Sequence, residues 1–387
     1  IGTPGVADAS WSDELSVDNG GGSVGRTLAV GSDGTLYAVW NVNTGSRFYT
    51  NFALSSDNGT SWDITEDVTD DLGPGGAALG ANIAIGPDDT LHITWVVRSE
   101  PGNNVYYTSS NDKGGTWSDG ILVSDGNSSD ANTPSLTVDT SGNVHIAWHT
   151  GDTDSETEYT RVFYANSTDR GATFSTPLQL NTNTTGHSAW PRFAVLGDGK
   201  IIAVAWRDNR DLTDWDVYVA VSQDGGTTFT ERAGLANRNV EWDPDIFVDR
   251  FGVIHLGVMV YDTGGIFIDY VKSEDFGATW TEPVRLTEYF SRFPYWAVNP
   301  SLDVMWLFWK DERDRTNETD VQADIAGKYS LDSGETWSDL DRATDLGTIE
   351  LKFPSLALGP DGTVYTIWSD ERDGSGENEQ LFFKGRT

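Results

Sequence analysis

The feature that most constrains this chain is a short motif that recurs at a regular spacing. The pattern S-x-D-x-G-x-[TS]-[WF] occurs six times, as SSDNGTSW (55–62), SNDKGGTW (110–117), STDRGATF (167–174), SQDGGTTF (222–229), SEDFGATW (273–280) and SLDSGETW (330–337). Its aspartates are separated by 55, 57, 55, 51 and 57 residues, with a mean of 55. The 387 residues therefore have room for about seven such units, one more than the motif marks.

A second pattern reveals the seventh unit. An apolar strand, a turn rich in Gly, Asp or Asn and a second alternating strand recur at 26–40, 81–95, 134–148, 191–206, 244–260, 294–309 and 354–368. Each copy is typical of a β-hairpin. A third strand follows each hairpin, and the aspartate motif then leads into a fourth strand. The repeating unit is therefore predicted to be a four-stranded antiparallel sheet.

The two ends of the chain complement each other. The last unit stops after its third strand, at QLFFKGRT, whereas the chain begins with SWSDELSVDN (10–19), which reads as a fourth strand without its own sheet. We predict that residues 10–19 complete the C-terminal blade formed by residues 349–387. The sequence thus predicts an all-β fold, a closed seven-bladed β-propeller, with residues 1–387 forming a single domain.

The residues and spacing of the motif resemble the Asp-box, or bacterial neuraminidase repeat, of sialidases and related secreted propellers. The resemblance covers the whole chain and implies a glycan site around the central axis, on the face opposite the Asp-boxes. Because the motif occurs in enzymes, lectins and assembly factors alike, we interpret its six aspartates as structural. The resemblance also implies a secreted, extracellular or cell-surface protein. No signal peptide is visible in the chain, which begins at Ile1.

Charge and composition limit the partners. The formal net charge of −35 repels nucleic acid phosphates and anionic membranes, and no apolar run is long enough to span a bilayer. We expect a monomer that binds a glycan, with neither nucleic acid binding nor membrane insertion. The chain has no Cys, so Cys-ligated metals are excluded, and no cofactor is expected. Acidic loops such as DTDSETE (152–158) are only weak candidates for structural Ca²⁺.

Aligning the first strands shows which blades depart from the repeat. One position at the axial mouth is occupied in turn by Thr27, Asn82, Ser135, Arg192, Asp245, Tyr295 and Ser355. Two residues earlier come Gly25, Gly80, Thr133, Trp190, Asp243, Phe293 and Phe353. Blades 4 to 6 carry the more elaborate side chains at these positions. Because functional sites break local pattern rules, these three blades are predicted to hold the site.

The resemblance implies an exo-acting, sialidase-like glycoside hydrolase for acidic sugars. Sialidases use a tyrosine nucleophile with a carboxylate partner. Tyr295 with Asp245 matches that pair, and Asp243 or Glu241 would be the acid/base. The candidates for substrate binding are Arg192, Arg292, Arg207, Arg313, Arg372, Trp190, Trp242, Trp296 and His187. Arg suits this task because it binds a carboxylate through two parallel hydrogen bonds.

Three of these arginines lie in a repeated loop. W-R-D-N-R (206–210), W-K-D-E-R (309–313) and W-S-D-E-R (368–372) are near-copies, which favours an Asp–Arg bridge that braces neighbouring blades. The alternative is that Arg207, Arg313 or Arg372 faces the mouth. Three histidines, His92, His145 and His255, occupy equivalent second-strand positions and are expected to be scaffold.

Three other functions fit the same residues. The first is a non-catalytic glycan-binding or adhesion propeller that uses the mouth as a shallow pocket. The second is a polysaccharide lyase for uronates, in which Tyr295 acts with His149 or His187. The third is a purely structural extracellular propeller.

Overall fold

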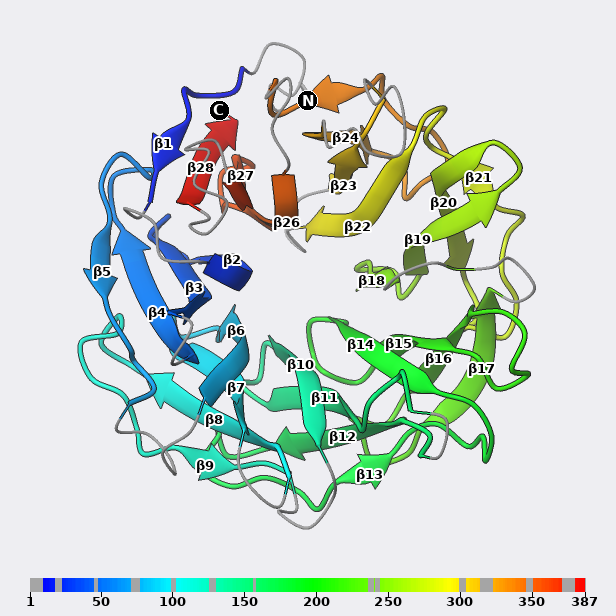
Figure 1. Cartoon of the computed structure of the whole chain (residues 1–387), viewed down its shortest axis with the longest axis horizontal. Helices are drawn as coiled ribbons and strands as arrows, with labels where there is room; N and C mark the ends of the chain where they lie inside the picture. The colour runs from blue at the N-terminus through cyan, green and yellow to red at the C-terminus, as the bar shows by residue number, and fades with distance from the viewer. Residues whose placement is uncertain are drawn as a thin grey trace.

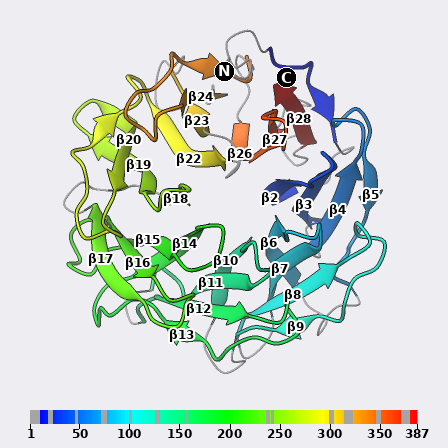
Figure 2. The same cartoon turned by 180° about the vertical axis from the view of Figure 1, so that it is seen from behind.

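The structure is a computed structural model, and it describes residues 10–17, 23–44, 48–70, 77–98, 102–124, 130–155, 158–235, 240, 244–298, 304–313, 323–345, 351–370 and 380–386. This part of the chain contains twenty-eight strands, β1 to β28, and no helix. The strands form seven four-stranded antiparallel sheets. Figures 1 and 2 show the sheets arranged as blades around one axis. The predicted all-β, seven-bladed propeller is confirmed.

Each blade follows the chain from the axis outwards. Blades 1 to 3 are β2 (Ser23–Val30), β3 (Leu36–Asn43), β4 (Phe48–Ser55) and β5 (Asp63–Thr65); β6 (Ala77–Ile85), β7 (Leu91–Arg98), β8 (Asn104–Ser110) and β9 (Ile121–Leu122); and β10 (Ala131–Val138), β11 (Val144–Thr150), β12 (Arg161–Ser167) and β13 (Leu178–Gln179). Blades 4 and 5 are β14 (Ser188–Val195), β15 (Ile202–Asp208), β16 (Asp216–Ser222) and β17 (Thr230–Leu235); and β18 (Asp245–Val248), β19 (Ile254–Asp262), β20 (Gly265–Ser273) and β21 (Val284–Arg285). Blades 6 and 7 are β22 (Ser291–Val298), β23 (Met305–Asp311), β24 (Asp324–Ser330) and β25 (Asp341–Arg342); and β26 (Leu351–Leu358), β27 (Val364–Asp370) and β28 (Gln380–Arg386) with β1 (Leu15–Ser16).

The N-terminal segment closes the ring as the sequence predicted. β1 pairs antiparallel with β28, with Leu15 opposite Phe383. An isolated bridge joins Trp11 to Arg386, and the Trp11 ring packs edge-on against Phe308 of blade 6 at 6.0 Å. The first and last segments of the chain therefore share one blade, which leaves no half-built sheet at the seam.

The second strand of each blade forms the core. β11, β15, β23 and β27 are buried along their whole length, because neighbouring blades cover both of their faces. A tryptophan lies at the same register in six of these second strands and is at most 1% exposed: Trp40, Trp95, Trp148, Trp206, Trp309 and Trp368. The fourth strands are short and mostly exposed. This packing fixes the first strands, which line the axis.

All six S-x-D-x-G turns share one hydrogen-bond pattern. In the turn at 110–117, Oδ1 of Asp112 accepts the N–H of Thr116 at 2.8 Å, and its Oδ2 accepts the Thr116 hydroxyl at 2.7 Å. The Ser110 hydroxyl donates to Asp112 at 2.7 Å and accepts the N–H of Gly114 at 2.9 Å. The aspartates at 57, 169, 224, 275 and 332 make the same contacts. The structural interpretation of these aspartates therefore fits their contacts.

The turns also join each blade to the one before it. In five turns the final aromatic ring packs edge-on against an aromatic ring in the third strand of the preceding blade, at 4.9–5.5 Å between centroids. Side chains add to this contact: Lys113 pairs with Asp33, and Arg170 with Asp88. Asp33 and Asp88 lie in the first hairpin turns of blades 1 and 2. The S-x-D-x-G turns and the first hairpin turns thus lie on one face, and the mouth is the opposite face.

Acid should weaken these turns. Hydrogen bonds donated by the residue four positions on lower the pKa of Asp57, Asp112, Asp169 and Asp275 from 3.8 to about 2. Between these two values the unfolded state binds more protons than the folded state, so stability falls as the pH drops. We expect the urea concentration at the unfolding midpoint to decrease as the pH is lowered from about 4 to about 2. A titration of urea unfolding against pH measures this.

The matched variant is Asp112→Asn, which keeps the size of the side chain and removes its charge. It should lower the melting temperature at pH 7 and flatten the acid dependence between pH about 4 and about 2. It should leave ligand binding intact, because Asp112 lies on the face opposite the mouth. An acid dependence as steep as that of the unsubstituted chain would contradict the assignment.

Candidate functional site

The mouth ends of the first strands share an unusual backbone. Six of the seven first strands contain a bulge, where the register with the second strand shifts. The bulge residue has a left-handed conformation in four blades: φ is 60° at Gly80, 42° at Thr133, 55° at Trp190 and 54° at Phe293. Bulges redirect side chains and are over-represented at functional sites.

Two bulges carry bulky side chains where the backbone favours glycine. A left-handed conformation costs a residue with a Cβ about 1–2 kcal/mol, and blade 2 avoids this cost with Gly80. Trp190 and Phe293 adopt the left-handed conformation despite this cost. Strained backbone persists where the surrounding structure enforces it, often at ligand sites. The conformation therefore marks Trp190 and Phe293 as candidate functional positions.

Trp190 belongs to a cluster around a buried arginine. Arg207, in β15, is only 6% exposed, and its guanidinium carbon lies 4.3 Å from the ring centroids of both Trp190 and Trp215. The two indole rings are 6.1 Å apart. A guanidinium between two indole faces is held by cation–π attraction and keeps a fixed orientation. His149 and His187 complete this group of five residues, which we call the blade 3–4 cluster.

His149 is a neutral member of the cluster. It is 4% exposed, and burial, together with the nearby Arg207, lowers its pKa to about 3. The backbone N–H of Trp190 donates to His149 Nδ1 at 3.4 Å, and the Thr133 hydroxyl lies 2.8 Å from the same atom. These contacts place the imidazole hydrogen on Nε2. His149 thus links the bulges of blades 3 and 4 and carries no charge at neutral pH.

His187 lies on the other side of the cluster. Its ring is 5.4 Å from Tyr159 and 6.5 Å from Trp215, and burial lowers its pKa. The N–H of Thr160 donates to His187 Nδ1 at 3.3 Å. His187 is therefore a packed, hydrogen-bonded residue beside Trp215, and its part in substrate binding stays a prediction.

A pocket opens next to the cluster. It has a volume of about 430 Å³ and extends from blade 2 to blade 4. The lining includes the aromatic side chain of Trp190, the cation of Arg98, the amide of Asn132 and the carboxylates of Asp130 and Asp152. An aromatic face with polar donors and acceptors around it suits a sugar ring. We call this the mouth pocket.

Asp245 has a structural task that the sequence did not indicate. Its Oδ2 accepts the backbone N–H of Trp296, in the next blade, at 2.7 Å, and its backbone carbonyl accepts the Trp296 indole N–H at 3.2 Å. Ser355 makes the equivalent bond, since its hydroxyl accepts the N–H of Leu28 at 3.1 Å. The repeat position at 245 therefore links adjacent first strands. Catalysis by Asp245 with Tyr295 stays a prediction.

The other predicted arginines occupy separate places. Arg192 donates to the carbonyl of Pro191 at 3.3 Å. Arg292 donates to Glu312 at 3.2 Å, and this buried carboxylate also pairs with Lys310. Glu241, Trp242, Asp243 and Arg372 lie outside the described residues. Of the predicted set, the structure therefore brings together Trp190, Arg207 and His187 at blades 3 and 4, and Asp245 with Trp296 at blades 5 and 6.

The W-x-D-x-R loops form bridges, but within one blade. Arg210 binds both carboxylate oxygens of Asp208, at 2.8 and 2.9 Å, and also pairs with Glu231 of β17 in the same blade. Arg313 binds Asp311 in the same way. The expectation that this bridge braces neighbouring blades is wrong, because residues two apart at a strand end reach each other directly. Arg207 instead lies against the rings of Trp190 and Trp215.

The three scaffold histidines have partners in their own blades. His92, His145 and His255 each place Nδ1 2.6–2.8 Å from a buried tyrosine hydroxyl, those of Tyr107, Tyr164 and Tyr270. The described residues hold no group of three or more His, Asp or Glu that could bind a metal ion. The acidic loop 152–158 is only partly described. In the described ranges, no helix is long and apolar enough to cross a membrane.

Trp215 and Arg98 escaped the sequence analysis. Trp215 lies in the loop between β15 and β16, and the corresponding loops of the other blades carry no tryptophan. That asymmetry could have revealed it. Arg98 ends β7, outside the three blades that looked unusual, and nothing in the sequence distinguishes it.

Similarity to known proteins is structural. No protein-family model matches the sequence, and no curated relative matches it. A Hadza microbial sialidase has a TM-score of 0.55 at 19% identity, over 92% of this chain and 74% of that protein. The endosialidase of phage phi92 has a TM-score of 0.57 at 10% identity, over 98% of this chain and 69% of that protein. The polysaccharide lyase Uly1 has a TM-score of 0.59 at 11% identity, over 93% of this chain and 89% of that protein. The chain thus shares a propeller fold with proteins that act on glycans.

Proposed function

We propose that this protein is a glycan-directed propeller that recognises a carboxylate-bearing sugar at the mouth of blades 3 and 4. The observation that carries the proposal is Arg207, buried between the indole rings of Trp190 and Trp215. Aromatic faces stack on sugar rings, and a fixed guanidinium suits a carboxylate. The mouth pocket beside it supplies polar groups for the sugar hydroxyls.

Charge supports an acidic ligand. The chain carries a net charge of −35, so an anion is repelled from most of its surface. At this mouth, however, Arg98 lines the same pocket as Trp190, Arg207 packs against the Trp190 ring, and His149 is neutral. Arg98 can pair with the carboxylate of an acidic sugar, and the carboxylates of Asp130 and Asp152 in the same pocket can accept its hydroxyl groups. The structural neighbours that act on glycans agree with this choice of ligand.

Sialidase-like hydrolysis is the catalytic form of the proposal that we favour. In this form the Tyr295 oxygen bonds to the anomeric carbon as the glycosidic bond breaks and the leaving oxygen takes a proton from the acid/base, and water then hydrolyses the covalent intermediate. Asp245 assists the tyrosine, and Asp243 or Glu241 acts as acid/base. The resemblance to the Asp-box repeat and the sialidases among the structural neighbours support it. A secreted or cell-surface location belongs to the same proposal, and no cofactor is required.

A lyase is the second candidate, and His149 is the observation that favours it. A neutral imidazole with its hydrogen on Nε2, close to Arg207, can neutralise a uronate carboxylate by hydrogen bonding. This makes the neighbouring C5 proton easier to abstract, as a β-elimination requires. The polysaccharide lyase Uly1 among the neighbours has the same fold. A binding-only propeller would use the same residues without turnover.

A panel of acidic glycans tests these possibilities. We expect binding of a sialoside, polysialic acid or a polyuronate, with sialic acid release or ultraviolet absorption of an unsaturated uronate as the readouts of turnover. Tyr295→Phe should abolish sialic acid release and preserve binding. Elimination products would establish the lyase, and binding without either product would establish a binding module. If no carboxylate-bearing glycan binds or reacts, the proposal is wrong.

A further inference from the structure

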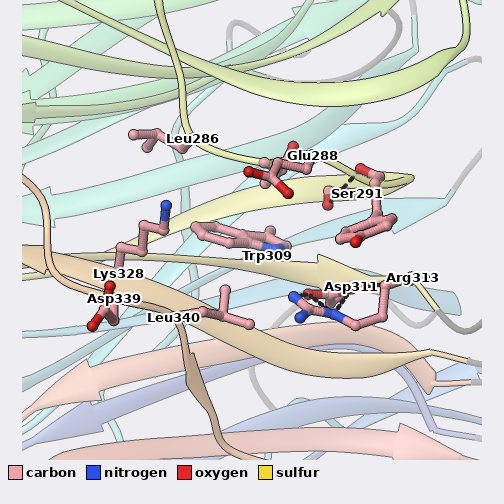
Figure 3. Close-up of a pocket in the computed structure, with 11 residues that line it drawn as sticks. Leu286, Glu288, Ser291, Trp309, Asp311, Arg313, Lys328, Asp339 and Leu340 are labelled. Atoms are coloured by element: carbon pink, nitrogen blue, oxygen red, sulfur yellow. Dashed lines mark hydrogen bonds and ion pairs between the residues drawn. The ribbon is translucent and has the colours of Figure 1, made fainter.

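A second pocket lies between blades 5 and 6, apart from the blade 3–4 cluster. It has a volume of about 200 Å³ and runs from the mouth rim towards the outside of the ring. The segment after β21 forms one wall, with Glu288 and Tyr289. Blade 6 forms the other, with Trp309, Arg313 and Lys328 (Figure 3). We call this the rim pocket.

The rim pocket contains a cation with no partner in the part of the chain that the structure describes. Lys328, in β24, makes no ion pair and no side-chain hydrogen bond with any residue that the structure describes. Most other described lysines and arginines of this acidic chain pair with a carboxylate, as Arg313 does with Asp311. Glu288 and Asp339 also line the pocket and offer acceptors for hydroxyl groups. Lys328 is thus available to an anionic group from outside.

The blade 6 wall of the pocket holds an indole N–H donor without an acceptor among the described residues. The indole N–H groups of Trp206 and Trp368 donate to the aspartate two residues on, at 3.1 and 3.0 Å. Trp309 is the equivalent residue of blade 6, and its buried N–H, like those of Trp40 and Trp148, has no partner among the described residues. A buried donor without an acceptor costs about 1–3 kcal/mol. Surrounding side chains cover it, so an acceptor reaches it only when they part.

The rim around the pocket is aromatic. Tyr289 is 51% exposed, and the guanidinium of Arg313 stacks on it with its carbon 5.6 Å from the ring centroid. Tyr261 and Phe290, on the same side of blades 5 and 6, are 54% and 37% exposed. Exposed aromatic rings beside a pocket are platforms for sugar rings. Together with Lys328 they match a carboxylate-bearing sugar.

We propose that the rim pocket is a second subsite for an acidic sugar residue and that the ligand is therefore a polymeric acidic glycan. A volume of about 200 Å³ is below the ~300–1,000 Å³ of pockets for drug-sized ligands, so it holds one ring of a longer chain. The carboxylate lies on Lys328, and the ring stacks on Tyr289. This inference rests on the proposed function, because the blade 3–4 cluster would bind another sugar residue of the same glycan.

Chain length provides the test. Calorimetry would compare a dimer and a decamer of galacturonate, and of N-acetylneuraminate, on the full chain. Two linked contacts bind more tightly than one, so the decamer should bind at least about tenfold more tightly than the dimer. Lys328→Met should remove this advantage and leave dimer binding unchanged. Equal affinities for dimer and decamer, or a full advantage in Lys328→Met, would overturn the inference.

A spectroscopic arm separates this inference from the proposed function. The indole N–H resonance of Trp309, assigned with Trp309→Phe, should shift on adding the decamer, in the unsubstituted chain and in Arg207→Met alike. The resonance of Trp368 is the control and should stay still. If the Trp309 resonance shifts but nothing binds at the blade 3–4 cluster, the rim subsite is supported and the proposed function is rejected. No shift of Trp309 at saturation would reject the rim subsite.

Discussion

Replacing Trp190 with glycine is expected to abolish most of the affinity for an acidic glycan while keeping the blade folded. Glycine suits φ 55°, so the backbone loses its strain. The substitution removes the stacking face and one of the two rings that hold Arg207. An aromatic hot spot contributes about 2 kcal/mol or more, which corresponds to a loss of about thirtyfold or more in affinity. Calorimetry with a uronate or sialic acid oligomer measures it.

Phe293→Gly is the matched control. It relieves the same left-handed conformation, φ 54°, at the equivalent bulge of blade 6. Affinity should stay within about twofold of the unsubstituted chain if the ligand is held by blades 3 and 4. The opposite result, a loss in Phe293→Gly and none in Trp190→Gly, would move the site to blade 6. That outcome would place substrate binding, as well as the predicted catalysis by Tyr295, on blade 6.

The sequence predicted the fold well because the same blade-forming pattern of strands and turns occurs seven times. A motif spaced by about 55 residues defined the blade, and the missing fourth strand of the last unit predicted the pairing of β1 with β28. The role of the S-x-D-x-G turns between blades was not visible. In five of the six turns the ring next to the glycine lies in the preceding unit, so one motif read by itself shows only its local turn.

The candidate site was predictable only in part. Asymmetry among the blades identified Trp190 because side chains at equivalent positions should otherwise be alike. The same asymmetry selected Asp245, although its carboxylate accepts the N–H of Trp296 and fills a role that Ser355 fills elsewhere. Residue type does not reveal such a backbone bond. Nor does it reveal a bulge, so the left-handed conformation at Trp190 needed the structure.

Gly334→Ala is expected to produce the largest loss of stability of any substitution considered for this chain. Gly334 has φ +83°, and a Cβ there would overlap the hydroxyl of Tyr270 and lie 2.6 Å from its Cζ. The left-handed backbone costs about 1–2 kcal/mol, and forcing an extra carbon into packed surroundings costs a further 1–3 kcal/mol or so. We expect a total of about 3 kcal/mol, measured as the free energy of unfolding in urea.

Gly277→Ala separates the two causes. Gly277 occupies the same place in its turn, with φ +80°, but the nearest atoms to an added Cβ lie 3.6 Å away. Blade 4 has Val219 where blade 5 has Tyr270, so no ring fills the space. Only the backbone cost of about 1 kcal/mol should appear. Equal losses in the two variants would show that the glycine serves its own turn alone. A larger loss in Gly334→Ala would show that the turn also holds blade 6 against blade 5.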